Sequence, residues 1–126
     1  MELKLSTIDG SFTIYRLPHD HKVPDSVFGT SFYSISRSDE ELSIVCPSSL
    51  MINSEKSESG WSGLKVLGPL DFSLTGILAN ISWHLAEAGI SIFAISTFDT
   101  DYILVKTEKL IEAKKVLSMA GYIFKD

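Results

Sequence analysis

The order of hydrophobic patterns in the second half of the chain constrains the fold more than any other feature. Short apolar or alternating runs, typical of strands, are interrupted twice by segments in which apolar residues recur at helical spacing. The expected elements are strands at residues 64–67, 90–97, 102–106 and 122–124, with helices at 73–88 and 107–120. This β-α-β-β-α-β order is that of the ferredoxin-like unit, in which both helices cover one face of the sheet.

Glycine and polar residues mark the expected helix ends. Asp71 or Ser73 can cap the start of the first helix, because a side-chain oxygen there accepts a hydrogen bond from a free backbone N–H. Gly89 stands where a left-handed C-terminal cap is expected, and Gly121 ends the second helix. Gly76 falls within the first turn of the first helix, where glycine destabilises a helix by about 1 kcal/mol relative to alanine.

The chain also contains an internal repeat. Residues 31–46 and 91–106 match at an offset of 60, and each copy reads as a β-hairpin with a short polar turn around an Asp. The identical pairs are Ser31/Ser91, Ile35/Ile95, Ser36/Ser96, Asp39/Asp99 and Val45/Val105. Duplication of one supersecondary unit explains why the turn and both flanking runs keep one register. Chance similarity between two amphipathic hairpins is the alternative.

The first half of the chain repeats the strands but not the helices. A strand at residues 11–17 is joined to the first hairpin only by residues 19–30, in which Pro24 permits at most a helical turn or two. No amphipathic helix follows Pro47, and the Ser-rich, charged residues 48–63 are interpreted as a linker. The expected domains are an abbreviated lobe with its linker at residues 1–60 and a complete lobe at residues 61–126.

Composition restricts the classes of function. The 126 residues, 44% of them hydrophobic, suffice for one ordinary domain or two very small ones. A formal net charge of -5 argues against binding to a nucleic-acid backbone. No apolar run approaches the roughly 18 residues of a membrane span, and the N-terminus lacks an apolar signal-peptide core, so neither membrane insertion nor secretion is expected. The single Cys46 cannot form an intramolecular disulfide, which fits a reducing, cytoplasmic compartment.

Motifs of catalysis and metal binding are missing from the sequence. It contains no spacing of a nucleophile and a base, no glycine-rich phosphate loop and no cluster of metal ligands, so neither an enzyme nor a cofactor is expected. His19 and His21 lack a third ligand at a recognisable spacing. Trp83 lies off the apolar stripe of its helix and marks either a contact surface or a packing site beneath the first lobe.

Two segments of the second lobe combine features that suit a small zwitterion. The helix start within residues 68–79 offers free N–H groups and a positive dipole end, which favour a carboxylate, and Gly76 lets a ligand approach the backbone. Asp99 and Asp101, in the turn at residues 97–101, can hold an ammonium or a guanidinium group. An amino acid carries charges of both signs. In the alternative interpretation, Gly76 permits tight packing and the Asp residues only shape a turn.

Residues 68–105 carry a specific family resemblance. The strings GPLDFSLTGILA and LAEAGISIFAISTFDTDYILV resemble the second lobe of small bacterial ACT-domain proteins. The YRLP and FYSISRSDEELSIVC segments are similar to the shorter N-terminal lobe of the same proteins. The resemblance implies an α+β fold of two ferredoxin-like (ACT, βαββαβ) lobes, the first abbreviated. It also implies a regulatory module that binds amino acids at interfaces between such domains, and hence a homodimer.

The same resemblance implies a set of ligand contacts. By motif they fall on the first loop and helix start and on the end of the second strand, at Asp71, Ser73, Thr75, Gly76, Ile77, Thr97, Phe98 and Asp101. Asp99 joins them because of its charge and its place in the same turn. Arginine-sensing ACT proteins of animals have a similar I-S-T-F segment followed by an acidic residue, which implies that Asp101 accepts a cationic side chain.

The sequence therefore favours an amino-acid-binding regulatory protein that acts as a sensor through lobe or dimer interfaces. Its expected partners are a small-molecule ligand and a second copy of the chain, with no nucleic acid and no membrane. The alternative is a protein-interaction or structural ACT module without a working ligand site.

Overall fold

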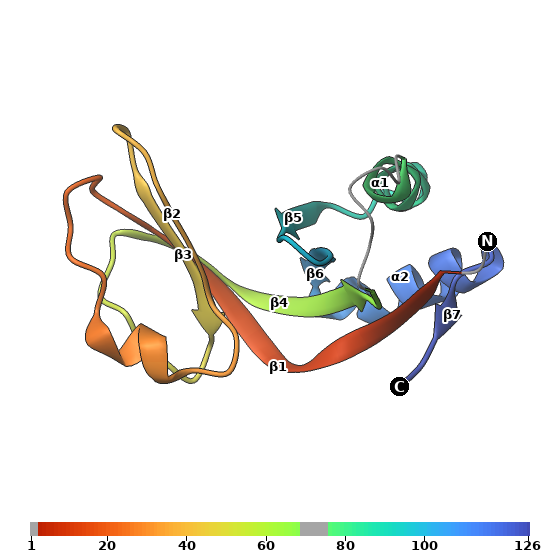
Figure 1. The fold of residues 1–126 in the computed structure, drawn as a ribbon, viewed down its shortest axis with the longest axis horizontal. Helices are drawn as coiled ribbons and strands as arrows, with labels where there is room; N and C mark the ends of the chain where they lie inside the picture. The colour runs from red at the N-terminus through yellow and green to blue at the C-terminus, as the bar shows by residue number, and fades with distance from the viewer. Residues whose placement is uncertain (1–2, 69–75) are drawn as a thin grey trace. The chain divides into compact units, whose positions relative to one another are not determined.

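The computed structural model describes residues 3–68 and 76–126 (Figure 1). The strands are β1 (Lys4–Leu17), β2 (Ser34–Arg37), β3 (Leu42–Pro47), β4 (Lys56–Val66), β5 (Ile92–Ser96), β6 (Asp101–Lys106) and β7 (Ile123–Phe124). The helices are two short 3₁₀ helices, η1 (Asp25–Gly29) and η2 (Thr107–Lys109), and two α-helices, α1 (Ile77–Glu87) and α2 (Leu110–Met119). Among the described residues, no helix is long and apolar enough to cross a membrane.

The described chain forms two compact units. Unit 1 comprises Met1–Asp9 and Ser62–Asp126, and unit 2 comprises Gly10–Trp61. The strands follow the order β2-β3-β1-β4-β6-β5, and β7 pairs with β1. Both β1 and β4 contribute residues to each unit, because each of these strands spans a boundary between the units. Unit 1 is therefore built from two separate segments of the chain.

Unit 1 has the predicted β-α-β-β-α-β order, formed by β4, α1, β5, β6, α2 and β7. β4 and β6 are neighbours in the sheet, as the first and third strands of a ferredoxin-like unit should be. The buried residues of its core include Leu64 and Val66 of β4, Ile103 and Val105 of β6, Ile81 and Leu85 of α1, and Ala113 and Leu117 of α2. Because alternate residues of a strand point to one face, both helices cover the same face of the sheet, as predicted.

The last strand of unit 1 does not pair with β4. β7 pairs in parallel with the beginning of β1, where Lys4 faces Ile123. On the other side of β1, the N–H of Leu67 donates a hydrogen bond to the carbonyl oxygen of Lys4 at 2.8 Å. The first residues of β1 are therefore inserted between β7 and β4. The predicted strand at residues 11–17 begins earlier than expected, at Lys4.

Glycines with positive φ mark the ends of both α-helices. Gly89 and Gly121 follow α1 and α2 with φ values of 73° and 104°, which confirms the two predicted C-terminal positions. Gly76 differs from its prediction, because it precedes α1 with a φ of 84° instead of lying inside the first turn. A residue in the left-handed region cannot continue a right-handed helix, so Gly76 marks where α1 begins. The expected caps Asp71 and Ser73 lie outside the described residues.

Unit 2 is an antiparallel arrangement in which β3 pairs with β1 on one side and β2 on the other. Its core comprises Tyr15, Leu17, Val27, Leu42, Ile44 and Cys46. Within residues 10–61, all of which are described, η1 is the only helix, which agrees with the turn or two that Pro24 permits. Burial raises the pKa of the Cys46 thiol, so this thiol stays protonated and poorly reactive while unit 2 is folded.

The interpretation of residues 48–63 as a linker is wrong for their second half. Residues 56–66 form the long strand β4, which lies between β1 and β6 in the sheet order. The Ser- and Glu-containing beginning of β4 is exposed, whereas Trp61 is buried. The side chains at the start of β4 have only a weak preference for strand. Pairing with β1 supplies the backbone hydrogen bonds that nevertheless hold these residues in a strand.

Asp126 belongs to a small polar network in unit 1. Its Oδ2 accepts hydrogen bonds from Nζ of Lys114 at 2.6 Å and from Oγ1 of Thr7 at 2.8 Å. Its Oδ1 accepts one from the N–H of Thr7 at 2.9 Å. Hydrogen bonds from Lys114 first, and then from Thr7, lower the pKa of the Asp126 carboxyl from 3.8 to about 2.

We expect Asp126→Asn to lower the free energy of unfolding by about 1 kcal/mol or less at pH 7, because the ion pair is partly exposed to solvent. A lowered folded-state pKa means that the network stabilises unit 1 above about pH 4 and is lost as the pH falls towards 2. Urea unfolding at a series of pH values measures the difference, with Asp9→Asn at an exposed position as the control. A difference that stays constant over this range contradicts the electrostatic explanation.

Candidate functional site

A cavity of about 320 Å³ lies at the turn of the β5–β6 hairpin in unit 1. Its lining residues come from β4, from the segment just after β4, from β6 and from the turn between β5 and β6, and they are Lys65, Gly68, Thr97, Asp99, Thr100 and Tyr102. We call it the hairpin-turn cavity. Two neighbouring strands and one tight turn therefore position its polar side chains.

Hydrogen bonds fix the turn that forms one wall of this cavity. The N–H and the Oγ1 of Thr97 both donate to the carbonyl oxygen of Thr100, at 2.8 and 3.1 Å. The N–H of Thr100 donates back to Oγ1 of Thr97 at 3.3 Å. Thr100 is buried, and its Oγ1 donates to the carbonyl oxygen of Val66 on β4. The turn is thus tied to a neighbouring strand, which holds the backbone of Asp99 in place.

The hairpin-turn cavity presents one cation and one anion. Lys65 is half-buried, with its Nζ 5.9 Å from the centroid of the Tyr102 ring, a distance at which a cation–π contact is favourable. Asp99 is exposed. Neither side chain forms an ion pair with any residue that the structure describes. Both charges are therefore available to a ligand.

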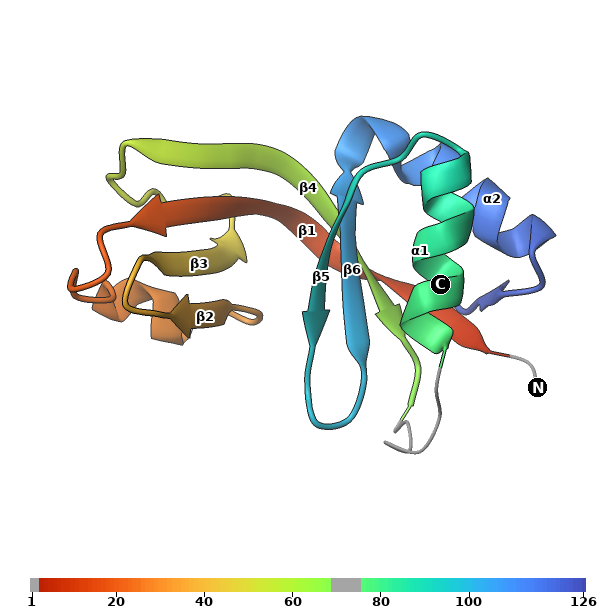
Figure 2. The same ribbon diagram turned by 90° about the horizontal axis from the view of Figure 1, so that it is seen from above.

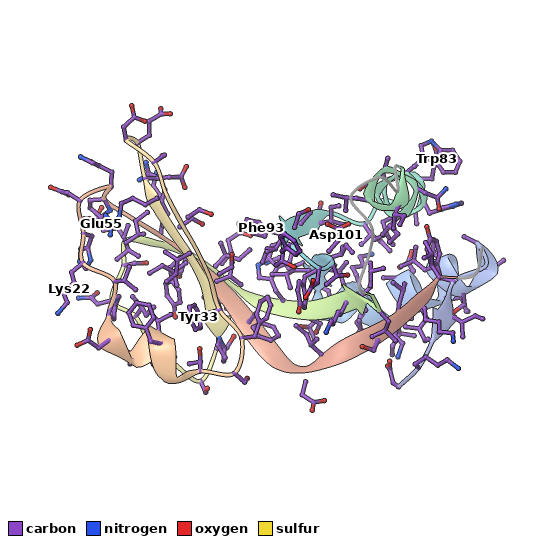
Figure 3. All side chains as sticks on the ribbon, viewed as in Figure 1. Lys22, Tyr33, Glu55, Trp83, Phe93 and Asp101 are labelled. Atoms are coloured by element: carbon purple, nitrogen blue, oxygen red, sulfur yellow. The ribbon has the colours of Figure 1, made fainter. Side chains whose placement is uncertain are left out.

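The pleat of the strands separates Lys65 from Asp101. Lys65 lies between two core residues of β4, so its side chain is on the sheet face that the helices do not cover. Asp101, labelled in Figure 3, lies two residues before the core residue Ile103 on β6, so the two side chains share the helix-covered face. Its Oδ1 accepts a hydrogen bond from Oγ of Ser96 at 2.6 Å. Asp101 therefore does not line the hairpin-turn cavity, although Asp99 does.

A second depression, of about 260 Å³, lies at the start of α1. It is lined by Leu3, Gly76, Ile77, Asn80, Ala120, Gly121 and Tyr122. The hydroxyl of Tyr122 donates to Oδ1 of Asn80 at 2.5 Å, and burial raises the pKa of this phenol. Figure 2 shows the start of α1 and the turn of the β5–β6 hairpin at the same end of unit 1.

The structure brings some of the predicted site residues together and separates others. Thr97 and Asp99 line the hairpin-turn cavity, whereas Gly76 and Ile77 line the depression at α1. Phe98 is 80% exposed and lines neither of them. In the part of the chain that is described, no three His, Cys, Asp or Glu side chains are grouped as a metal ion would require. The predicted site residues that lie outside the described residues are Asp71, Ser73 and Thr75.

The sequence prediction missed several residues of the hairpin-turn cavity. They are Lys65, Gly68, Thr100 and Tyr102. Lys65 is the one charged residue in the apolar run 64–67, and this interruption is the signal that could have marked it. Tyr102 meets Lys65 only because β4 pairs with β6, and no local pattern reports a pairing between strands so distant in sequence.

Comparison with known proteins identifies the family. The family model of the ACT domain matches residues 56–119, about half of the chain, and a second model, of an N-terminal domain, matches residues 10–52. The chain therefore belongs to the ACT-domain family, and its α+β fold agrees with the ferredoxin-like lobes that the resemblance implied. The ACT match covers β4 to α2 and includes the hairpin-turn cavity, whereas the second match lies within unit 2.

Three similar proteins illustrate this relationship. A protein from Agobacterium tumefaciens with a crystal structure is 37% identical in sequence to this chain. The two structures superpose with a TM-score of 0.91, and the match covers 99% of this chain and 93% of the other. The cytosolic arginine sensor for mTORC1 subunit 1 of Pongo abelii is 31% identical over an alignment of 115 positions, and the match covers 79% of this chain. The chain spans about a third of that protein's length (35%). An aspartate kinase of Clostridium acetobutylicum shares the fold at 15% identity, with a TM-score of 0.68 over 90% of this chain and 33% of the kinase.

Proposed function

We propose that the chain is a regulatory ACT protein that binds an amino acid in the hairpin-turn cavity. The observation that carries this proposal is the presence of opposite charges, Lys65 and Asp99, in one cavity. A free amino acid carries an α-carboxylate and an α-ammonium group on the same carbon. Each of these groups needs a partner of opposite charge when it leaves water.

In the proposed complex, Lys65 binds the α-carboxylate and Asp99 binds the α-ammonium group. The ring of Tyr102 offers an apolar wall to the side chain of the ligand. The cavity volume, about 320 Å³, lies at the lower end of the range for small-molecule sites and suits a ligand of this size. An amino acid of about ten heavy atoms gains roughly 0.5–0.8 kcal/mol per atom, which corresponds to micromolar to sub-millimolar affinity.

The choice of amino acid is a separate part of the proposal. Similarity to a protein named as an arginine sensor supports a cationic ligand. The family resemblance assigns the cationic side chain to Asp101, whose carboxylate lies on the helix-covered face and is hydrogen-bonded to Ser96. Because Asp101 does not line the hairpin-turn cavity, Asp101→Ala should leave the binding of arginine or lysine intact, and loss of binding without unfolding would move the site to the helix-covered face.

A thermal-shift panel of the twenty amino acids, with nucleotides as controls, tests the proposal. We expect at least one amino acid, at ten times its dissociation constant, to add about 1.4 kcal/mol and raise the Tm by roughly 5 °C. Lys65→Gln and Asp99→Asn should each abolish this shift, because each removes one charge from the hairpin-turn cavity. Glu40→Gln changes an exposed acidic residue in the turn of the β2–β3 hairpin and should leave the shift intact.

Two results would contradict the proposal. A flat panel at millimolar concentrations excludes an amino acid as the ligand. A shift that survives in both Lys65→Gln and Asp99→Asn places the ligand elsewhere in the protein. Glu40→Gln separates these outcomes from a general effect of net charge, since it removes one negative charge as Asp99→Asn does.

The outer faces of the helices favour a second candidate function, that of a protein-interaction module. Trp83 is 58% exposed and points outward from α1 in Figure 3, and Ile111 and Met119 are each 84% exposed on α2. Large exposed apolar residues of this kind are enriched at contact surfaces. Light scattering distinguishes the two functions. A homodimer whose stability responds to an amino acid supports the first, and a monomer with a flat panel supports the second.

A further inference from the structure

Unit 2 contains a cavity of about 400 Å³ with charges of its own. Its lining includes three basic side chains, Arg16, His21 and Lys56, and one acidic side chain, Glu55. Residues 10–61 hold only four Lys and Arg against seven Asp and Glu, yet two of those four line this single cavity. We call it the unit 2 cavity. Positive charge is therefore concentrated in one place on a unit that is acidic as a whole.

The cations of the unit 2 cavity are not neutralised by the chain itself. Nη2 of Arg16 donates a hydrogen bond to the backbone carbonyl oxygen of Glu40 at 3.3 Å, which orients the guanidinium group. The remaining N–H groups of the guanidinium can still donate to a ligand. Within residues 3–68 and 76–126, neither the ammonium of Lys56 nor the carboxylate of Glu55 forms an ion pair.

The loop that carries His21 is held in one conformation. Arg37 donates through Nη1 to the carbonyl oxygen of His19 and through Nη2 to that of His21, the latter at 2.8 Å. Nδ1 of His21 lies 2.8 Å from the carbonyl oxygen of Lys22. Because a carbonyl oxygen only accepts, Nδ1 must carry the hydrogen in this contact. Nε2 of the neutral ring then carries a lone pair and only accepts, so Arg16 and Lys56 are the charged donors that line the cavity.

We propose that the unit 2 cavity binds a small anion with two negative charges, of the phosphate or dicarboxylate class. The planar guanidinium of Arg16 presents parallel N–H donors that match two oxygens of a carboxylate or a phosphate. Lys56 supplies a second positive charge, and the amide of Asn53, which also lines the cavity, can donate a neutral hydrogen bond. This site is independent of the amino-acid site proposed above, which lies in unit 1.

Isothermal titration calorimetry at constant ionic strength tests this inference, with sodium phosphate and sodium succinate as probes and sodium chloride as the reference. We expect saturable, millimolar binding of at least one dianion. Arg16→Gln and Lys56→Gln should each weaken it about fivefold or more, and Glu55→Gln should strengthen it about twofold, because that change removes a like charge. Lys115→Gln alters the net charge equally at an exposed position on α2 and should have no effect.

Protection of the buried Cys46 thiol from labelling reports, in each variant, that unit 2 remains folded. Tighter binding of phosphate identifies a tetrahedral anion, tighter binding of succinate identifies a dicarboxylate, and either result supports the site. The inference is overturned if neither dianion saturates at tens of millimolar, or if Lys115→Gln weakens binding as much as Arg16→Gln does. A flat amino-acid panel leaves this outcome unaffected, because the probes differ.

Discussion

Leu117→Ala is expected to lower the free energy of unfolding by about 3 kcal/mol or more, the largest effect that we anticipate for one substitution. Leu117 is fully buried where α2 meets the sheet of unit 1. Truncation removes apolar contacts and leaves a void, because the surrounding side chains relax only in part. For a chain of this length the loss corresponds to a decrease in Tm of roughly 10 °C. Urea and thermal unfolding followed by far-UV circular dichroism measure it.

Met119→Ala is the matched control for Leu117→Ala. Met119 lies on the same helix but is largely exposed, so its truncation should change stability by no more than about 0.5 kcal/mol. Equal effects of the two substitutions would mean that α2 does not pack on the sheet through the face that contains Leu117.

Gly63→Ala is expected to lower the free energy of unfolding by about 2 kcal/mol. Replacing glycine by alanine usually has the opposite effect, because alanine reduces the conformational entropy of the unfolded chain. A Cβ atom at Gly63 would lie 2.5 Å from Cδ1 and 2.6 Å from Cγ1 of Ile8, and 3.2 Å from Cδ2 of Leu104. Leu104 is fully buried and has little room to move. Ile8 must therefore leave its position, and the close approach of two strands in unit 1 is disturbed.

Gly29→Ala is the control for this prediction, because a Cβ at Gly29 would meet nothing within 4 Å and its φ lies outside the left-handed region. It should change stability by about 0.5 kcal/mol at most. The cause is tested by combining Gly63→Ala with Ile8→Ala in a double-mutant cycle. A favourable coupling of about 1 kcal/mol is expected if Ile8 is the obstacle. Strict additivity would show that the loss has another origin.

The parts of the fold that could be predicted from sequence are those set by local periodicity. The helical spacing of apolar residues correctly placed Ile81 and Leu85 in the core, and the second helix begins at Thr107, as η2 followed by α2. The strand at residues 56–63 could not be predicted in this way. Apart from Trp61 its side chains are small or charged, and its strand conformation depends on pairing with β1, which is distant along the chain.

Both segments of the proposed internal repeat form β-hairpins, as expected, but the turns of the two hairpins are not offset by 60 residues. In both hairpins a four-residue turn is closed by the same hydrogen bond, from the N–H of Ser38 to the carbonyl of Glu41 at 2.9 Å and from Thr97 to Thr100 at 2.8 Å. Equivalent turn residues thus differ by 59 positions, not by the 60 that five identities suggested. A shift of one residue exchanges the two faces of a strand. At the offset of 59 the core residues Ile44 and Cys46 correspond to the core residues Ile103 and Val105, whereas the identity of Val45 with Val105 joins opposite faces.

The candidate site was predictable only where one segment supplies it. Thr97 and Asp99 belong to a single turn, and the sequence prediction includes both residues in one site. Lys65 reaches the same cavity from another strand, so its contribution depends on the pairing of β4 with β6. Asp99 and Asp101 were treated as one pair because they are close in sequence, but the pleat assigns Asp101 to the other face of the sheet.

The division of unit 1 into two segments has a consequence for how the protein is made. Residues 3–9 are synthesised before Gly10–Trp61, and the whole of unit 2 emerges before the second segment of unit 1, which begins at Ser62. The part of β1 that belongs to unit 1 must wait for β4 and β7, and until then its backbone groups are open to pairing with other chains. The speed of translation across residues 62–126, more than the stability of the finished fold, then sets how long the nascent chain carries this unprotected edge.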